Sequence, residues 1–119
     1  MWALGNISGD STTHRDIVLK HGALDALLKI CNEPELPKDF VSKATWAISN
    51  LCRGQPAPSR DYVKAAIPAL LFIIHSFKDD SEIISDALWA LSSLSENEES
   101  LQIVISCHYA IRDLVDLLE

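Results

Sequence analysis

Two pairs of side chains in this sequence combine an indole with an amide at helical spacing. Trp2 precedes Asn6 by four residues, and Trp46 precedes Asn50 by the same interval, so each pair lies on one face of a helix. An amide offers a donor and an acceptor to the main chain of an extended peptide. Indole faces can hold an aliphatic stem with a charged end, because cation–π attraction adds about 0.5–2 kcal/mol to burial of the stem. The pattern predicts a surface that binds lysine- or arginine-containing peptides.

Packing in the core is the ordinary role of a helical tryptophan, and it would explain any one of these indoles alone. The repeated pairing with an amide argues against it, since a buried amide without a partner costs about 1–3 kcal/mol. We therefore expect Trp2, Trp46 and Trp89 to form walls along one surface, with Asn6 and Asn50 as an exposed ladder beside them. Side chains of the ligand would enter slots between successive indoles.

Acidic residues near this ladder favour a basic ligand. The chain has 17 acidic and 10 basic residues and a formal net charge of −7, so it repels nucleic acid. Helical phase places Asp10 one turn beyond Asn6, and it places Glu82 and Asp86 on the same face as Trp89. Most of the other acidic residues are explained by the solubility of the chain alone.

The tryptophans also mark a long internal repeat. They recur at intervals of 44 and 43 residues, and a second phrase that begins at Ala23 returns at Ala66 and Ala110. A period of about 40–47 residues, with a short helix, a longer helix and a third helix that carries Trp, is typical of an α-solenoid. We expect whole units at 11–53 and 58–95, the end of a preceding unit at 1–8, and the start of a further unit at 97–119.

Cysteine and histidine spacing supports neither a metal site nor a disulfide framework. The cysteines are odd in number and lack a Cys-x-x-Cys pair, and the histidines lack the spacing of a zinc motif. We interpret the cysteines as small buried apolar residues and expect no metal and no other cofactor. The residues concerned are Cys31, Cys52, Cys107, His14, His21, His75 and His108.

A catalytic role is not indicated either. The nearest candidates, Cys52 beside Arg53 and His75 beside Ser76, have no third triad member and no oxyanion loop. The longest apolar run, at 65–74, is too short to span a bilayer. We find no signal peptide before the first repeat. The expectation is a non-enzymatic binding protein of the cytosol or nucleus that contacts no membrane.

Three segments resemble importin-α (karyopherin-α), an armadillo-repeat nuclear import adaptor. They are Trp-Ala-Leu-Gly-Asn-Ile-Ser-Gly-Asp at 2–10, Trp-Ala-Ile-Ser-Asn-Leu-Cys-Arg at 46–53, and Asp-Ala-Leu-Trp-Ala-Leu-Ser at 86–92. The resemblance spans nearly the whole chain and is closest to the central repeats of the family. It implies a single all-α domain at 1–119, an armadillo-repeat solenoid in which three-helix repeats form a right-handed superhelix.

The resemblance also implies a role for each residue of the ladder. Tryptophans of this family sandwich lysine stems of nuclear localisation signals, asparagines hold the peptide backbone, and acidic residues take the ammonium groups. Arg53 matches a family residue that orients its neighbours and limits where basic side chains can lie. By position, the peptide-binding residues would be Trp2, Asn6, Gly9, Asp10, Trp46, Asn50, Arg53, Glu82, Asp86 and Trp89.

Two residues depart from the family pattern. Ser93 stands where the Trp-to-Asn spacing would place an amide, so it is not counted as a clamp. Lys43 stands one turn before Trp46, where the family commonly has a neutral asparagine. A cation there repels a basic peptide unless it bends away or pairs with Asp39, so it bears on local affinity and register.

Partners follow from the same resemblance. We expect basic localisation peptides of cargo proteins as ligands, and importin-β as a partner of the full-length protein through a segment outside this chain. Shuttling between cytoplasm and nucleus is implied, and uncovered helix faces at both ends predict self-association at high concentration. The alternative is another armadillo scaffold, an adhesion or signalling adaptor with a different extended partner. The acidic residues of the ladder argue against it, because such grooves often carry basic residues.

Overall fold

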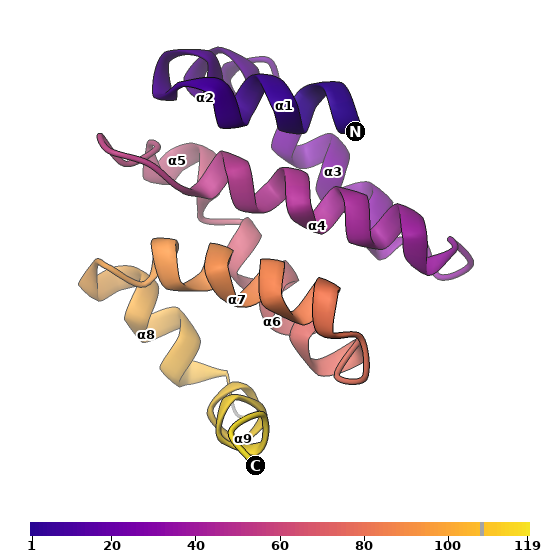
Figure 1. The fold of residues 1–119 in the computed structure, drawn as a ribbon. Coiled ribbons are helices and arrows are strands. Elements are labelled where there is room, and N and C mark those ends of the chain that lie inside the picture. Colours follow the sequence, from indigo (N-terminus) through magenta and orange to yellow (C-terminus); the bar gives the residue numbers. More distant parts are fainter. Residues whose placement is uncertain (108) are drawn as a thin grey trace.

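The computed structural model describes residues 1–107 and 109–119, and His108, one of the histidines that lack metal-site spacing, lies outside the described residues. All regular elements of the described residues are helices, which confirms the predicted all-α class. In chain order (Figure 1) they are α1 (Trp2–Asp10), α2 (Thr12–Lys20), α3 (Ala23–Asn32), α4 (Lys38–Cys52), α5 (Arg60–Val63), α6 (Ala66–Ser76), α7 (Ser81–Leu94), α8 (Glu98–Ser106) and α9 (Ala110–Asp116).

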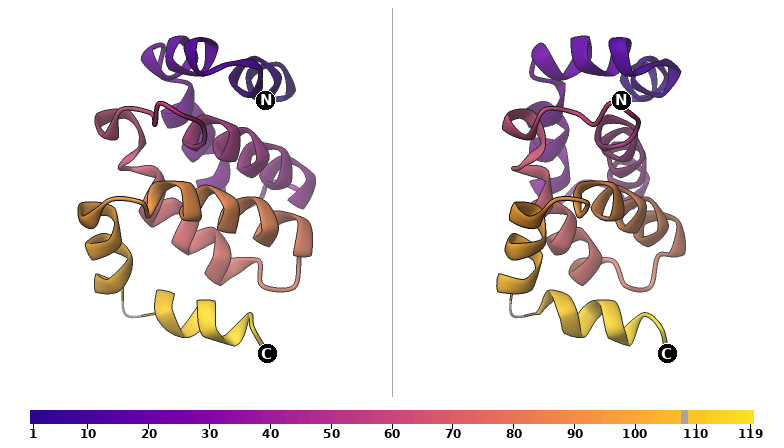
Figure 2. Two further views of the ribbon diagram at one scale, coloured as in Figure 1. Left: turned by 60° about the vertical axis from the view of Figure 1, so that its left-hand side comes forward. Right: turned by 90° about the vertical axis from the view of Figure 1, so that its left-hand side faces the viewer.

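The helices stack in two layers. The three helices that carry tryptophan, α1, α4 and α7, follow one another in one layer, and α4 packs against both of the others. In the second layer α3 packs against α4, and α6 packs against α3 and α7 (Figure 2). Residues separated by one repeat in the sequence therefore become neighbours in space.

Short polar residues and glycine set helix ends in this stack. The Ser11 hydroxyl accepts a hydrogen bond from the His14 amide at the start of α2, with an oxygen–nitrogen distance of 3.1 Å. The Asp80 carboxylate does the same for the Ile83 amide at the start of α7, also at 3.1 Å. Between α2 and α3, Gly22 has φ +80°, a left-handed conformation that glycine adopts without a steric penalty. These caps satisfy backbone groups that the helix itself leaves without partners.

Aliphatic side chains fill the space between the layers. Ile48 and Leu51 of α4 and Ile83 of α7 are completely buried. Other buried residues of the same helix lie three or four positions from each of them. Burial of each such side chain contributes about 1.5–3 kcal/mol relative to exposure. The core thus holds α4 and α7 with their tryptophan sides turned away from it.

Two of the three cysteines belong to this core, as the sequence predicts. Cys31 and Cys52 are buried, whereas Cys107 is partly exposed, so the expectation of burial is wrong for that residue. Burial raises the pKa of the Cys52 thiol to about 12 and that of Cys31 to about 11. Both groups therefore remain uncharged thiols of low nucleophilicity at neutral pH.

A buried arginine ties α2 to the end of α4. Arg15 is 1% exposed, and its Nη1 donates to the backbone oxygen of Arg53 over 2.9 Å. Its Nε and Nη2 both donate to the Asp16 carboxylate, which balances the buried charge. Because Arg53 is the residue that ends α4, this contact fixes the backbone from which the Arg53 side chain projects.

A buried carboxylate plays a corresponding role near the other end of the chain. Asp113 of α9 is 1% exposed and accepts from Lys78 Nζ at 2.5 Å and from His75 Nδ1 at 2.7 Å. The hydrogen bond from Lys78 and then that from His75 hold the pKa of Asp113 below its ordinary value of 3.8, although burial opposes the shift. This ion-pair cluster joins α9 to the end of α6.

We predict that Asp113→Asn lowers the free energy of unfolding at neutral pH by about 1.5–3 kcal/mol, the range for hydrogen bonds to a charged group. A carboxylate with a lowered pKa stabilises the fold fully above its ordinary pKa, and the contribution is lost as pH falls through the lower folded-state value. Urea unfolding at pH 7 and at about pH 3 should thus show a smaller difference between variant and wild type in acid. Asp116→Asn, an exposed change on the same helix, is the control. Equal effects of the two substitutions at pH 7 would contradict the prediction.

Candidate functional site

The three tryptophans lie on one side of the α1–α4–α7 layer, which we call the tryptophan face. Trp2 of α1 is 58% exposed and Trp89 of α7 is 71% exposed, while Trp46 of α4, between them, is partly buried. Large exposed indoles on adjacent helices are unusual for a core role. The prediction that these residues line a surface rather than fill the interior is confirmed for Trp2 and Trp89.

A cavity opens between the second and third tryptophans, and we call it the Trp46–Trp89 cavity. Its volume is about 360 Å³. Two indoles line it, together with one carboxylate from α7 and one guanidinium from the end of α4. The lining residues are Trp46, Ser49, Asn50, Arg53, Asp86, Trp89 and Ser93. Five of the predicted binding residues therefore meet in one place, although they come from two repeats.

The slot predicted between the first and second tryptophans is closed. The ring centroids of Trp2 and Trp46 lie 5.5 Å apart with an angle of 37° between the ring planes. Carbon atoms in contact lie about 3.5–4.0 Å apart, so a stem between two parallel rings would require a separation of about 7–8 Å. The expectation that every pair of successive indoles forms an open slot is therefore wrong for this pair.

A glycine of α1 explains the position of the Trp46 ring. A Cβ atom on Gly5 would lie 2.2 Å from Cζ3 of Trp46, a distance that no real side chain tolerates. The absence of that atom lets the ring lie directly on the α1 backbone, where it also meets Trp2. Close approach of α1 and α4 thus draws Trp46 toward Trp2 and leaves the Trp46–Trp89 cavity open on the other side.

The same approach buries the second amide of the ladder. Asn50 is 3% exposed, and its Nδ2 donates to the Gly5 backbone oxygen over 2.9 Å. The expectation of an exposed amide is wrong for Asn50, because a backbone carbonyl from the neighbouring helix supplies the partner that the amide needs. Asn50 nevertheless lines the Trp46–Trp89 cavity, and among the described residues no buried polar side-chain atom lacks a hydrogen-bond partner.

The other predicted residues of α1 lie apart from this cavity. Asn6 is exposed, as predicted, and it lines a shallow hollow of about 470 Å³ together with Asp10 and two neighbours on α1 and α2. Asp10 pairs with His14, with 2.8 Å between Oδ2 and Nδ1. Gly9 faces α4, where a Cβ atom would lie 3.2 Å from Nδ2 of Asn50. Gly9 therefore gives room to the binding residues and offers the ligand no side chain.

The two acidic residues of α7 lie one turn apart at the edge of the tryptophan face. Glu82 is exposed, and Asp86 is partly buried beside Trp89 in the Trp46–Trp89 cavity. Burial is the larger cause that raises the pKa of Asp86 above its ordinary value, and repulsion from the Glu82 carboxylate adds to it. A bound cation would relieve both effects, so the pair is suited to an ammonium or guanidinium group.

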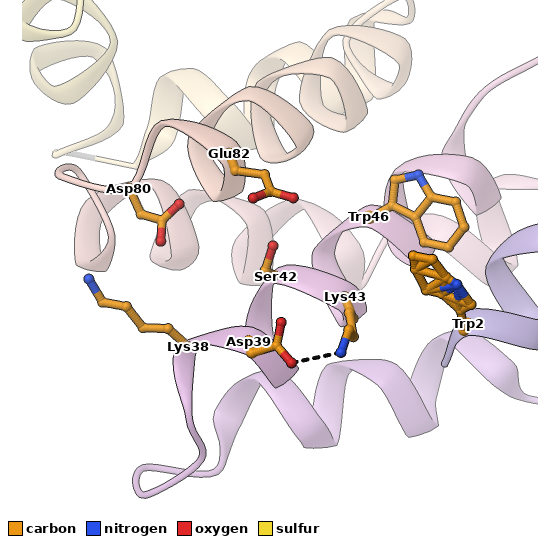
Figure 3. A pocket seen from close by; sticks show the side chains of 8 residues that line it. All are labelled: Trp2, Lys38, Asp39, Ser42, Lys43, Trp46, Asp80 and Glu82. Atoms are coloured by element: carbon orange, nitrogen blue, oxygen red, sulfur yellow. Dashed lines mark hydrogen bonds and ion pairs between the residues drawn. The ribbon is translucent and has the colours of Figure 1, made fainter.

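A second large hollow, which we call the Trp2–Trp46 cavity, lies on the other side of Trp46 and has a volume of about 510 Å³ (Figure 3). Its lining mixes both signs of charge. Lys43 Nζ lies 2.7 Å from Asp39 Oδ2, so of the two arrangements considered for Lys43, bending away or pairing with Asp39, the pair is present. The lining residues are Trp2, Lys38, Asp39, Ser42, Lys43, Trp46, Asp80 and Glu82.

Several lining residues were not foreseen from the sequence. Ser49 and Ser93 in the first cavity, and Lys38, Ser42 and Asp80 in the second, were not counted as binding residues. Ser49 could have been found from the pattern, since it follows Trp46 by three residues and so lies on the same helix face. In the structure its hydroxyl donates to the backbone oxygen of Trp46. Asp80 could not have been found in this way, because an aspartate at the start of a helix indicates a helix cap. Asp80 does cap α7, and it lines the cavity as well.

Other kinds of site find no support in the described part of the chain. No group of three or more His, Cys, Asp or Glu side chains there is arranged to hold a metal ion. Among the same residues, no helix combines the length and the apolar character needed to cross a bilayer. The tryptophan face and its two cavities are therefore the features on which a functional proposal can be built.

Comparison with known proteins gives concordant results. The family model of the armadillo/β-catenin-like repeat matches residues 11–53. The chain is 47% identical to importin subunit alpha-2 of Arabidopsis thaliana and 45% identical to importin subunit alpha-1b of Oryza sativa subsp. japonica, over 100% and 99% of its own length and 22% of each relative. It is 37% identical to the probable importin subunit alpha-A of Dictyostelium discoideum, over 99% of the chain and 24% of that protein. The chain thus spans about a fifth to a quarter of these relatives.

We predict that Gly5→Ala destabilises the protein and moves the Trp46 ring. Alanine is favoured over glycine within a helix by about 0.8–1.0 kcal/mol, so local propensity alone would stabilise α1. The clash with Trp46 costs about 1–3 kcal/mol and should reverse the sign. Thermal unfolding and tryptophan fluorescence would measure the two effects.

A double substitution provides the control for this clash. In a Trp46→Ala background the ring is absent, so Gly5→Ala should become neutral or stabilising. Destabilisation of the same size in both backgrounds would show that contact with Trp46 is not the cause.

Proposed function

The chain belongs to the importin α family of armadillo-repeat proteins, and from this premise we propose that its tryptophan face binds lysine- and arginine-rich nuclear localisation signal peptides in extended form. Armadillo-repeat proteins of this family are non-enzymatic adaptors, in agreement with the prediction that the chain is not an enzyme. The observation that carries the proposal is the Trp46–Trp89 cavity, in which two indoles and the Asp86 carboxylate converge.

The cavity suits a basic side chain in both its apolar and its charged parts. The faces of Trp46 and Trp89 can take the methylene stem of lysine or arginine, with cation–π attraction of about 0.5–2 kcal/mol. Asp86 lies in the same cavity and can receive the charged end. Arg53 also lines the cavity, and its positive charge limits the positions that a ligand cation can occupy there.

The peptide backbone would be held by amides that differ in their capacity. Asn50 lines the cavity and can offer a peptide N–H its Oδ1, while Nδ2 already donates one of its two hydrogens to the Gly5 backbone oxygen. Asn6 is exposed on α1 and can both donate and accept. Packed helices lie about 8–10 Å apart, and two residues of an extended peptide span about 6.6–6.8 Å. Roughly every second peptide residue can therefore meet one helix of the layer.

The whole protein would use this surface as part of a longer array. We infer that it acts as a nuclear import adaptor, which binds the localisation signals of cargo proteins and moves between cytoplasm and nucleus. Importin-β would bind a segment outside the residues described here. The alternative of an adhesion or signalling adaptor is not favoured, because the identity to importin α subunits extends along 99–100% of the chain for the three relatives named above.

We predict that Trp89→Ala weakens binding of a lysine-rich localisation peptide by about thirtyfold, since truncation of a central tryptophan in an interface costs about 2 kcal/mol. Trp89 is largely exposed, so the fold should survive. Phe72→Ala is the matched control, because Phe72 is an exposed aromatic residue of α6 that lines neither cavity. Isothermal titration of both variants measures the difference. Equal affinity of the two variants would refute the assignment of the binding surface.

A second prediction concerns pH. A bound cation favours the ionised form of Asp86. Affinity should therefore be highest above the raised pKa of Asp86 and should fall as pH drops through it. Asp86→Asn should lower affinity by about threefold to fivefold at neutral pH and should reduce the loss of affinity that wild type shows as pH falls through the raised pKa of Asp86. Asp79→Asn, an exposed change in the loop before α7, should retain the wild-type profile. An unchanged profile in Asp86→Asn would assign the pH dependence to another group.

A further inference from the structure

Equivalent positions of the two central helices carry opposite charges. One repeat separates Trp46 of α4 from Trp89 of α7, and the residue three positions before each is Lys43 in α4 and Asp86 in α7. Because α4 and α7 pack side by side, the two residues occupy corresponding places at the edge of the tryptophan face. The residue three positions before the indole is therefore acidic at Trp89 and basic at Trp46.

The ammonium group of Lys43 pairs with Asp39, a carboxylate of α4 with which a basic ligand could otherwise pair. Lys43 Nζ lies 2.7 Å from Asp39 Oδ2, and both side chains line the Trp2–Trp46 cavity (Figure 3). A basic side chain of a ligand would have to displace Lys43 before it could pair with Asp39. The protein's own lysine thus stands where a ligand lysine would otherwise find its partner.

Beside the Lys43–Asp39 pair, three charged residues line the Trp2–Trp46 cavity, and two of them are acidic. The Asp80 carboxylate caps α7 by accepting from the Ile83 amide. Glu82 lies seven residues before Trp89, about two helical turns along α7. Lys38 lines the same cavity and opposes Glu82 in sign. A ligand cation at this site could therefore pair with Glu82, but Glu82 is exposed, and a pair between exposed charges contributes only about 0–1 kcal/mol.

Contact between the two indoles acts in the same direction. With 5.5 Å between their centroids, Trp2 and Trp46 leave no space for a methylene stem. The Trp46 ring lies against Gly5 of α1, so a ligand side chain could enter between the two indoles only if one of the rings moved. The Trp46–Trp89 cavity requires no such movement, because it is already open.

We propose that Lys43 is a specificity-determining residue that makes the two sites unequal. The Trp46–Trp89 cavity selects a lysine or arginine of the ligand, whereas the site beside Trp2 and Trp46 gives a basic side chain little advantage over an uncharged one. This inference rests on the proposed binding of basic peptides and adds to it the pattern of residues that the ligand carries. Ligands of this chain need one strongly bound basic residue and gain little from a second at the neighbouring site.

The test is a lysine scan of the peptide against protein variants. A lysine-rich peptide and its single lysine-to-alanine variants are titrated into wild type, Lys43→Asn and the matched control Lys29→Asn. Lys29 is an exposed lysine of α3 that lines neither cavity, so the control removes the same charge elsewhere. The peptide position that loses its sensitivity in Trp89→Ala marks the Trp46–Trp89 cavity. The position that responds to Trp2→Ala marks the other site.

In wild type, alanine at the peptide position that marks the Trp46–Trp89 cavity, the first position, should weaken binding by about tenfold or more. Alanine at the position that marks the site beside Trp2 and Trp46, the second position, should weaken it by less than about twofold. In Lys43→Asn the second position should become sensitive by about threefold to fivefold, as expected for one exposed charge pair, while Lys29→Asn should behave as wild type. Equal sensitivity at both positions in wild type, or equal behaviour of the two lysine variants, would overturn the role of Lys43 while leaving peptide binding in place. No binding of any peptide by the folded protein would instead overturn the proposed function itself.

Discussion

The contact between α1 and α4 at Gly5 is the interaction on which the binding surface depends. One backbone carbonyl of α1 accepts from Nδ2 of Asn50, and the missing Cβ of the same residue admits the Trp46 ring. Both contacts require the two helices to approach more closely than any larger residue would allow. They set the position of the central indole, and through it the size of the cavity on each side.

Buried and exposed charges have different tasks in this protein. Arg15 and Asp113 are almost completely buried and paired, and each joins a helix to another part of the stack. Removal of a partner from such a pair is costly, because it leaves an uncompensated charge in the interior. The charges of the tryptophan face are more exposed and therefore individually weak, with about 0–1 kcal/mol expected for each pair. These charges act in the selection of ligands, for which a difference in affinity of a few-fold between neighbouring sites is sufficient.

Much of the fold and part of the site were predictable from local pattern. The spacing of the tryptophans and of the Ala23, Ala66 and Ala110 phrases indicated a solenoid, and helical phase placed Asp86 near Trp89. Pairing of Lys43 with Asp39 was one of two arrangements considered for that lysine, and a separation of four residues in one helix permits it. These features depend on residues close in sequence or on a regular period, and a linear chain displays both directly. Resemblance to one family was visible for the same reason, since its phrases lie within single helices.

The sequence by itself determined the helical repeat, the common face of the tryptophans and the acidic character of the chain. Only the tertiary structure decided that Asn50 is buried and donates to Gly5, that Trp2 and Trp46 touch, and that an open cavity lies between Trp46 and Trp89. Each of these outcomes depends on the distance between helices that are one repeat apart in the chain. That distance is set where side-chain volumes meet across the contact, as at Gly5 and Trp46, and the spacing of residues along either helix does not contain it.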